Sequence, residues 1–198
     1  MATLLLFSSN FGLSQRICER IAERLVVAGE RAQVAPLAAG VDPAGFDAVV
    51  IGASIKHGKH HPSVLEFIRR HQVALSERPS ALFSVNLVAR KPAKRTPQTN
   101  PYLKALLAQS PWTPGLLGVF AGELDYARYG PVDKQMMRFV MWINGGPTDP
   151  STRKQFTDWD EVDRFAERVL QLTAALRAST PAATPVSAPV VEADALPA

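Results

Sequence analysis

The chain has 198 residues, of which 22 are Lys or Arg and 18 are Asp or Glu, so its formal net charge is +4. This length predicts one domain, and 46% hydrophobic residues are enough for a core without disulfide bonds. The single Cys18 excludes a disulfide framework and a cysteine-rich metal site. No apolar run reaches the ~20 residues that span a bilayer as a helix.

Short apolar runs predict five strands, and the segments between them have the spacing of helices. The strands are expected at 3–8, 33–37, 48–53, 80–88 and 116–121. The first helix contains Ile17, Pro62 is placed to start the second, and Asn100 caps a short third helix. The last helix begins near Asp158, and its apolar face continues to about Arg177.

Strands that alternate with helices predict an α/β fold with right-handed crossovers. Five strands in a small domain favour the flavodoxin-like, doubly wound five-stranded parallel sheet in the order 2-1-3-4-5, with an inserted helical segment after strand five. We expect this domain to cover residues 1–177. Residues 178–198 are rich in Pro and Ala and have no basic residue, which predicts a disordered tail.

Ligands of such sheets bind at the carboxyl ends of the strands, where the first and third strands diverge. Three loops meet there, at 8–14, 54–61 and 86–95. Residues 86–104 hold five basic residues and no acid, and residues 54–71 hold four basic residues and one acid. The fold brings both runs to one edge, so we favour anion recognition or contact with anionic lipid over a solvated basic loop.

The first loop offers backbone N–H groups and a helix N-terminus to a dianion. Ser9 and Ser14 add hydroxyl groups, and Gly12 permits a close approach. The loop lacks the lysine of a triphosphate-binding loop and the GxGxxG pattern of a dinucleotide site. An ordinary turn capped by serine is the alternative.

The second loop has polar residues bracketed by Gly52 and Gly58, a composition that suits a planar ligand. Its histidines, His57, His60 and His61, have no carboxylate near in sequence. Solvated or anion-contacting histidines are therefore favoured over metal ligands, and no metal site is expected.

The segment 126–144 is longer than an ordinary connection and contains three of the four methionines. Its apolar residues surround most of a predicted helix, which favours contact with a membrane or a quinone. A helix packed on the domain's own core is the alternative. The predicted contact residues are Met136, Phe139, Val140, Trp142 and Ile143.

The residues that point to a known family are Val50-Ile51-Gly52-Ala53-Ser54-Ile55, Ser84-Val85-Asn86-Leu87-Val88-Ala89-Arg90-Lys91-Pro92, Lys94-Arg95-Thr96-Pro97-Gln98-Thr99-Asn100, Ala121-Gly122, Tyr126, Arg128-Tyr129, Gly145-Gly146, Thr148-Asp149 and Thr157-Asp158-Trp159. In these the chain resembles the bacterial menaquinone-dependent protoporphyrinogen IX dehydrogenases, a flavodoxin-like family of haem biosynthesis. The resemblance covers about residues 1–176, and the stretch 86–100 is its most specific part.

The resemblance implies one FMN at the three loops. Its phosphate would be held by Ser9, Asn10, Phe11, Gly12, Leu13 and Ser14. Its isoalloxazine would be flanked by Ser54, Ile55, Lys56, Gly58, Asn86, Leu87 and Val88. Flavodoxins usually have T-x-T-G-x-T in the first loop. Phe11 removes the middle hydroxyl, so one phosphate hydrogen bond has to come from elsewhere.

The resemblance further implies oxidation of protoporphyrinogen IX with a quinone, menaquinone or ubiquinone, as acceptor. The counter-charges for the substrate propionates would be Arg90, Lys91, Lys94 and Arg95. We expect a peripheral protein on the cytoplasmic face of the cell membrane. A homo-oligomer stays open at this stage, as does the choice of quinone.

Two flavoproteins are alternatives: a flavodoxin-like electron carrier and an NAD(P)H:quinone reductase. Carriers of that kind are typically acidic, whereas here basic residues gather at the predicted flavin edge. A basic module that binds nucleic acid or membrane is disfavoured, because the run 90–104 has no pattern of aromatic residues interleaved with its cations and no helix-turn-helix or RRM signature is present. We therefore expect no nucleic-acid partner.

Overall fold

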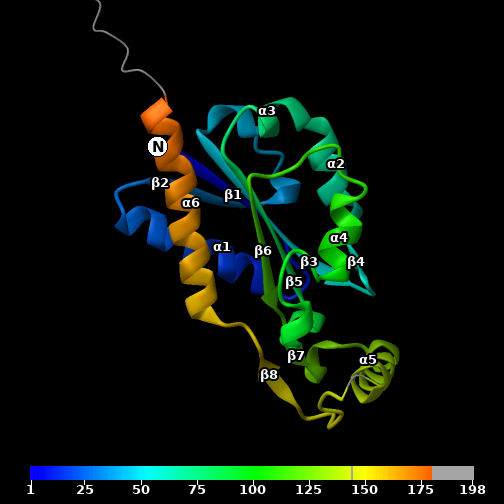
Figure 1. The fold of residues 1–198 in the computed structure, drawn as a ribbon. Coiled ribbons are helices and arrows are strands. Elements are labelled where there is room, and N and C mark those ends of the chain that lie inside the picture. Colours follow the sequence, from blue (N-terminus) through cyan, green and yellow to red (C-terminus); the bar gives the residue numbers. More distant parts are fainter. Residues whose placement is uncertain (144, 180–198) are drawn as a thin grey trace, which may run out of the picture.

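Five parallel strands form the centre of the fold in the computed structural model, which describes residues 1–143 and 145–179 (Figure 1). They are β1 (Ala2–Ser8), β2 (Arg31–Pro36), β3 (Ala48–Lys56), β5 (Ser80–Asn86) and β6 (Leu116–Ala121). Their order, β2-β1-β3-β5-β6, is the predicted doubly wound order. The short β4 (Lys59–His60) pairs antiparallel with the end of β3.

The apolar runs of the sequence form the inner strands because both of their faces are covered. Leu4, Leu5 and Leu6 of β1 are fully buried, and all seven residues of β5 are buried. The strand β5 ends at Asn86, two residues earlier than predicted. The Asn86 side chain accepts a hydrogen bond from the Ala89 N–H, which turns the chain into a 3-10 helix.

Helices cover both faces of the sheet (Figure 1). The helices α1 (Leu13–Val27) and α6 (Trp159–Ser179) pack on one face. On the other face lie α2 (Pro62–Arg70), α3 (Gln72–Ser76) and α4 (Pro101–Leu107). Short 3-10 helices occupy Leu37–Ala39, Pro43–Gly45, Leu87–Arg90, Pro92–Lys94 and Tyr126–Arg128.

An ion cluster joins α1 to α6. The Asp163 carboxylate of α6 accepts hydrogen bonds from Arg20 and Arg24 of α1. These hydrogen bonds hold the pKa of Asp163 well below its usual range. The two helices are thus fixed to each other beside β1, whose carboxyl end leads into the first predicted ligand loop.

The predicted helical insertion is present between β6 and α6. It consists of β7 (Glu123–Asp125), α5 (Pro131–Ile143) and β8 (Arg153–Gln155), and β7 pairs with β8 as an antiparallel ribbon. The ribbon was not predicted. Its base is closed: the Phe156 N–H donates to the Gly122 carbonyl at 3.1 Å, and the Thr157 hydroxyl donates to the Ala121 carbonyl at 2.7 Å.

Two predictions concern the chain end and the membrane. The helix α6 continues to Ser179, and residues 180–198 of the predicted tail lie outside the described residues, so the tail stays a prediction. In the part of the chain that the structure describes, none of the helices has both the length and the apolarity needed to cross a bilayer.

Candidate functional site

A pocket of about 400 Å³ opens at the carboxyl ends of β1, β3 and β5. Each of the three predicted loops contributes to its wall: the first with Ser9, Asn10, Phe11 and Leu13, the second with Ser54, Ile55, Lys56, His57 and Gly58, and the third with Asn86, Leu87, Val88 and Arg90. The inserted helix α5 closes the opposite side. The convergence expected from the strand order is therefore observed.

The first loop leaves the N-terminus of α1 available to an anion. Gly12 precedes the helix in the left-handed region with a φ of 87°, and α1 has neither a side-chain cap nor an acid in its first turn. The Ser9 hydroxyl accepts a hydrogen bond from the Gly12 N–H at 2.9 Å. The Ser14 hydroxyl is buried, and the described residues give it no hydrogen-bond partner. A helix N-terminus without a side-chain cap and a hydroxyl without a partner fit a bound phosphate.

The first and second loops are tied together by Ser54. Its hydroxyl oxygen accepts from the Asn10 backbone N–H at 3.2 Å and from Asn10 Nδ2 at 3.0 Å. The same hydroxyl donates to the Ser8 carbonyl at 3.3 Å. The hydrogen bonds between Ser54 and Asn10 therefore hold the first and second loops in a fixed position relative to each other. Gly52, which the sequence placed at the ligand loop, lies inside β3, where an added Cβ would be 2.2 Å from Cζ of Phe83.

The third loop is fixed by two buried amides. Asn100 Nδ2 donates to Asn86 Oδ1 at 3.1 Å and to the Lys94 carbonyl at 3.0 Å. Asn86 Nδ2 donates to Asn100 Oδ1 at 3.4 Å and to the Ser84 hydroxyl at 3.1 Å. From the sequence, Asn100 was expected as a helix cap and as the end of the stretch 86–100 that carries the resemblance. It also holds the loop that flanks the pocket.

The three loop histidines take separate roles. His60 Nε2 lies 2.9 Å from the Ser84 hydroxyl, and burial lowers the pKa of His60 to about 4, so its imidazole is neutral. His61 caps α2, and His57 Nε2 lies 3.3 Å from Asp133 of α5 across the pocket. Over the described ranges, 1–143 and 145–179, no three metal-binding side chains gather.

The insertion is anchored to the first loop by Phe11. The Phe11 ring meets the Tyr129 ring edge to face, with centroids 5.3 Å apart, and the Phe11 carbonyl accepts from Arg128 at 2.8 Å. Phe11 thus joins the insertion to the first loop. The sequence showed only the loss of the hydroxyl.

The predicted contact residues of α5 fall on two sides of the helix. Met136 and Val140 line the pocket, together with Met137 and the buried Met141. The side chains that do not line it are strongly exposed: Phe139 at 60%, Trp142 at 70% and Ile143 at 62%. One helix therefore gives an apolar wall to the pocket and an apolar face to the surroundings.

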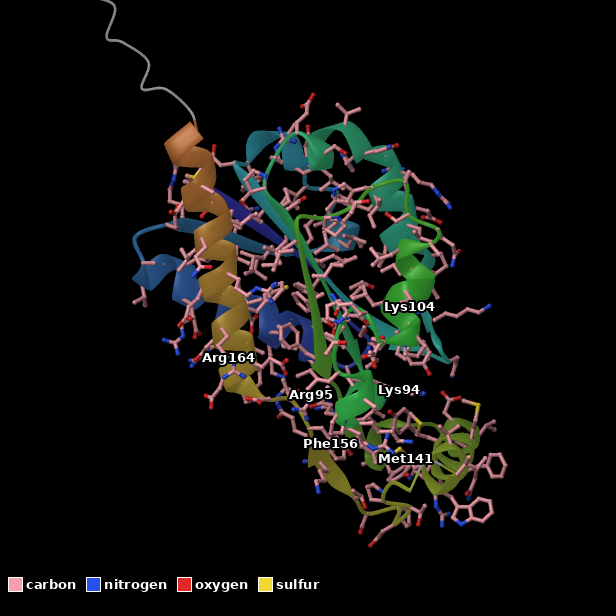
Figure 2. The ribbon with its side chains drawn as sticks, in the orientation of Figure 1. Lys94, Arg95, Lys104, Met141, Phe156 and Arg164 are labelled. Carbon is pink, nitrogen blue, oxygen red and sulfur yellow. The ribbon has the colours of Figure 1, made fainter. Side chains whose placement is uncertain are left out.

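The four predicted substrate cations are also divided. Arg90 lines the pocket, and its Nη1 donates to the Leu87 carbonyl at 3.3 Å. Lys91 and Lys94 are not among the lining residues, and Arg95 lines a second groove beside α6. In Figure 2, Arg95 lies toward Arg164 of α6, whereas Lys94 lies on the other side. That all four recognise the substrate stays a prediction.

Comparisons with known proteins agree with the geometry. A family model described as a flavodoxin domain matches residues 4–151. A protein of Escherichia coli named protoporphyrinogen IX dehydrogenase (quinone) is 43% identical over 175 residues, which is 87% of this chain and 97% of that protein. A protein of the same name from Leishmania major is 39% identical over 87% of this chain and 76% of its own length.

The fold is also similar to that of a solved short-chain flavodoxin associated with a bacterial microcompartment. The TM-score is 0.50 at 11% sequence identity, and the match covers 87% of this chain and 99% of the flavodoxin. This likeness supports the sheet order and the helix layers.

Proposed function

Because this chain belongs to the flavodoxin-domain family of quinone-linked protoporphyrinogen IX dehydrogenases, we propose that it oxidises protoporphyrinogen IX to protoporphyrin IX and passes the electrons to a quinone. One observation carries the proposal: the 43% identity with the Escherichia coli dehydrogenase extends over 97% of that protein, including the inserted segment. The pocket between the flavodoxin-like loops and this insertion is the site that we assign to the cofactor and the substrate.

FMN is the cofactor that a flavodoxin domain implies, and the residues present fit it. The uncapped N-terminus of α1 and the orphaned Ser14 hydroxyl suit the phosphate. We assign the phosphate to residues 9–14. We assign the isoalloxazine to the lining residues Ser54, Ile55, Lys56, Gly58, Asn86, Leu87 and Val88. Bound there, FMN supplies redox chemistry that takes hydride equivalents from carbon and gives electrons to a quinone.

The chain itself contributes binding and orientation. Arg90 offers a guanidinium to a propionate of the substrate, beside the apolar wall formed by Met136, Val140 and Met141. Methionine side chains adapt to varied apolar surfaces, which suits a flexible porphyrinogen and a quinone ring. Lys91, Lys94 and Arg95 act at longer range by attracting the dianionic substrate.

We assign the outer face of α5 to the membrane, where quinones are dissolved. Phe139, Trp142 and Ile143 are exposed there, and Lys134 and Arg138 of the same helix suit anionic headgroups. The protein then lies on the cytoplasmic face of the membrane as a peripheral protein. Its pocket opens beside the helix that contacts the lipid.

Anaerobic turnover tests this function. Protoporphyrinogen IX is mixed with the FMN-loaded protein and a menaquinone or ubiquinone analogue, and porphyrin fluorescence is followed. We expect porphyrin formation that depends on quinone, because three two-electron transfers need an acceptor. NADPH serves as the competing donor. Quinone reduction by NADPH without porphyrinogen oxidation would establish the quinone reductase instead. If the quinone is reduced neither with porphyrinogen nor with NADPH, an electron carrier is favoured.

A further inference from the structure

His57 lies at the tip of the hairpin between β3 and β4, in a backbone conformation that few side chains adopt. Its φ is 49°, and it is the one residue other than glycine with a positive φ in the part of the chain that the structure describes. The following Gly58 also has a positive φ, of 78°. Turns of this kind favour Asn followed by Gly, so the histidine is kept here against the preference of the backbone. Such a conformation points to a role for the side chain.

The His57 side chain lines the pocket assigned to FMN and meets a carboxylate from the opposite wall. Asp133 also lines the pocket, and its Oδ1 lies 3.3 Å from His57 Nε2. Asp133 is in the first turn of α5, where the helix dipole favours a negative charge. A carboxylate at Nε2 holds the proton of the neutral imidazole on that nitrogen. The described residues give Nδ1 of His57 no hydrogen-bond partner, so Nδ1 is left as a proton acceptor.

The other titratable or charged groups of the pocket are less suited to carry a proton. The Glu123 carboxylate is occupied, because it accepts hydrogen bonds from Arg16 and Arg128. Phenols as a class hold their proton near neutral pH, and burial raises the pKa of Tyr129 further. Imidazole is the side chain that gains and loses a proton most readily near neutral pH. The remaining groups around His57 are two cations and a phenol of the pocket wall and one lysine at the base of the hairpin: Lys56, Arg90, Tyr102 and Lys59.

The oxidation proposed above moves protons as well as electrons. In each two-electron step, one hydrogen leaves a carbon that bridges two pyrroles together with its bonding electron pair, and both pass to FMN. A second hydrogen leaves a pyrrole nitrogen as a proton, and a double bond forms between the bridging carbon and the ring. When the quinone takes up the electron pair and the first hydrogen, it needs one further proton to complete its two O–H bonds. Each cycle therefore releases one proton in the pocket and consumes one.

We propose that His57 is the catalytic residue that carries this proton, a role that rests on the function proposed above. His57 Nδ1 accepts the proton from the pyrrole nitrogen and afterwards gives it to an oxygen of the quinone, which returns the imidazole to its neutral form. Asp133 is a positioning residue, because it acts through His57. It orients the imidazole and stabilises its protonated form between the two steps.

The variant His57→Asn tests this role in the full chain loaded with FMN, because asparagine suits the turn and cannot carry a proton. The porphyrinogen step is followed without quinone as the loss of flavin absorbance. The quinone step is followed as the return of this absorbance after reduction with dithionite. We expect both rates to fall at least about tenfold. Imidazole added to the solution should restore them in part, because 54% of the His57 side chain is exposed.

The matched control is His61→Asn. It removes another imidazole of the same loop, one that is not among the residues lining the pocket. Asparagine also keeps a side chain that can cap α2, as His61 does. We expect both rates to stay within about twofold of those of the native protein.

The two steps should depend on pH in opposite ways. The porphyrinogen step needs neutral His57 and slows as the pH falls, whereas the quinone step needs protonated His57 and slows as the pH rises. Both dependences should be absent from His57→Asn. Nitrogen NMR of histidine-labelled protein without FMN reports the position of the imidazole proton. We expect it on Nε2 of His57 in the native protein and shared between both nitrogens in Asp133→Asn.

The outcomes separate this role from the function on which it rests. Native rates in His57→Asn, or an equal loss in His61→Asn, would overturn the proposal. A loss that imidazole does not reverse and that keeps the native pH dependence would also overturn it, because it indicates a structural effect. An unchanged proton position in Asp133→Asn would remove Asp133 as the positioning residue. If porphyrinogen does not reduce the native protein, the function proposed above fails, and the quinone step alone still decides whether His57 supplies a proton.

Discussion

Asn86 and Asn100 are fourteen residues apart in sequence, and each donates an amide hydrogen bond to the other inside the protein. Asn100 also accepts from the backbone N–H groups of Tyr102 and Leu103 and donates to the Lys94 carbonyl. Both side chains are buried, so water cannot replace these bonds. The pair therefore sets the shape of the loop between them, which includes Arg90.

The variant Asn100→Ala tests this role. We expect its free energy of unfolding to fall by about 2–4 kcal/mol, because Asn86 and the end of the loop lose buried partners. We also expect weaker FMN binding, measured by fluorescence titration. Gln109→Ala, at an exposed position two residues after the end of α4, is the control and should change stability by less than about 0.5 kcal/mol. Equal effects of the two variants would contradict the prediction.

The variant Arg90→Gln tests recognition of the substrate carboxylate. We expect the KM for protoporphyrinogen to rise about tenfold, because a charge-assisted hydrogen bond is lost. The rate at saturating substrate should change less. Steady-state kinetics compares it with Arg95→Gln, which lies in the other groove, and with Lys104→Gln, an exposed residue of α4. If Arg95→Gln has the larger effect, the assignment to Arg90 is wrong.

Exposed apolar residues of α5 predict membrane binding. The double variant Phe139→Asp and Trp142→Asp should lose sedimentation with vesicles of phosphatidylglycerol and phosphatidylcholine, because its apolar face no longer enters the interface. Turnover with a water-soluble quinone analogue should persist. Val27→Asp and Val73→Asp are the control, since these valines are also exposed but lie on α1 and α3. Release of the control variant would show that α5 is not the attachment site.

His60 predicts a pH dependence of stability. Its pKa falls from 6.5 to about 4 on folding, so the unfolded chain binds more protons between these values. The free energy of unfolding therefore has its full value, as far as His60 is concerned, above pH 6.5. It decreases as the pH falls toward 4, because the unfolded chain takes up a proton at His60 that the folded chain does not. Urea unfolding at several pH values should show this loss in the native protein and a flatter profile in His60→Gln. Ser84→Ala should keep the native slope, because burial is the cause of the shift.

Phe11 predicts a link between the first loop and the insertion. We expect Phe11→Ser to cost about 0.5–1.5 kcal/mol of aromatic pairing and to speed amide exchange across Tyr126–Ile143. Tyr129→Phe keeps the ring and should leave exchange near the native rate. Unchanged exchange in Phe11→Ser would remove Phe11 as the anchor of the insertion.

Much of the fold is predictable because its signals are local. Continuous apolar runs located the inner strands, and the alternation of strands with helices in a small domain favoured the order that is observed. The end of β5 was misplaced because Leu87 and Val88 continue the apolar pattern, while the Asn86 side chain turns the backbone. The ribbon β7–β8 was missed because strands of three residues, one of them entirely exposed, leave no periodic pattern.

The location of the site was predictable, because it is determined by the carboxyl ends of the strands. The three loops were found in this way, but the contacts that shape them join residues distant in sequence, such as Asn10 with Ser54 and Asn86 with Asn100. The cations between residues 90 and 95 were treated as one surface, because the sequence does not show in which direction each side chain points. In the fold, Arg90 faces the pocket and Arg95 faces α6.

The closed base of the insertion has a consequence for how such enzymes diversify. Segment 123–155 leaves and re-enters the domain at Gly122 and Phe156, which share a backbone hydrogen bond of 3.1 Å. A chain that departs and returns at one point can be lengthened, shortened or exchanged while the sheet keeps its register. The flavodoxin core and the segment over its pocket can therefore evolve at different rates. The same redox domain can carry insertions of different length and sequence.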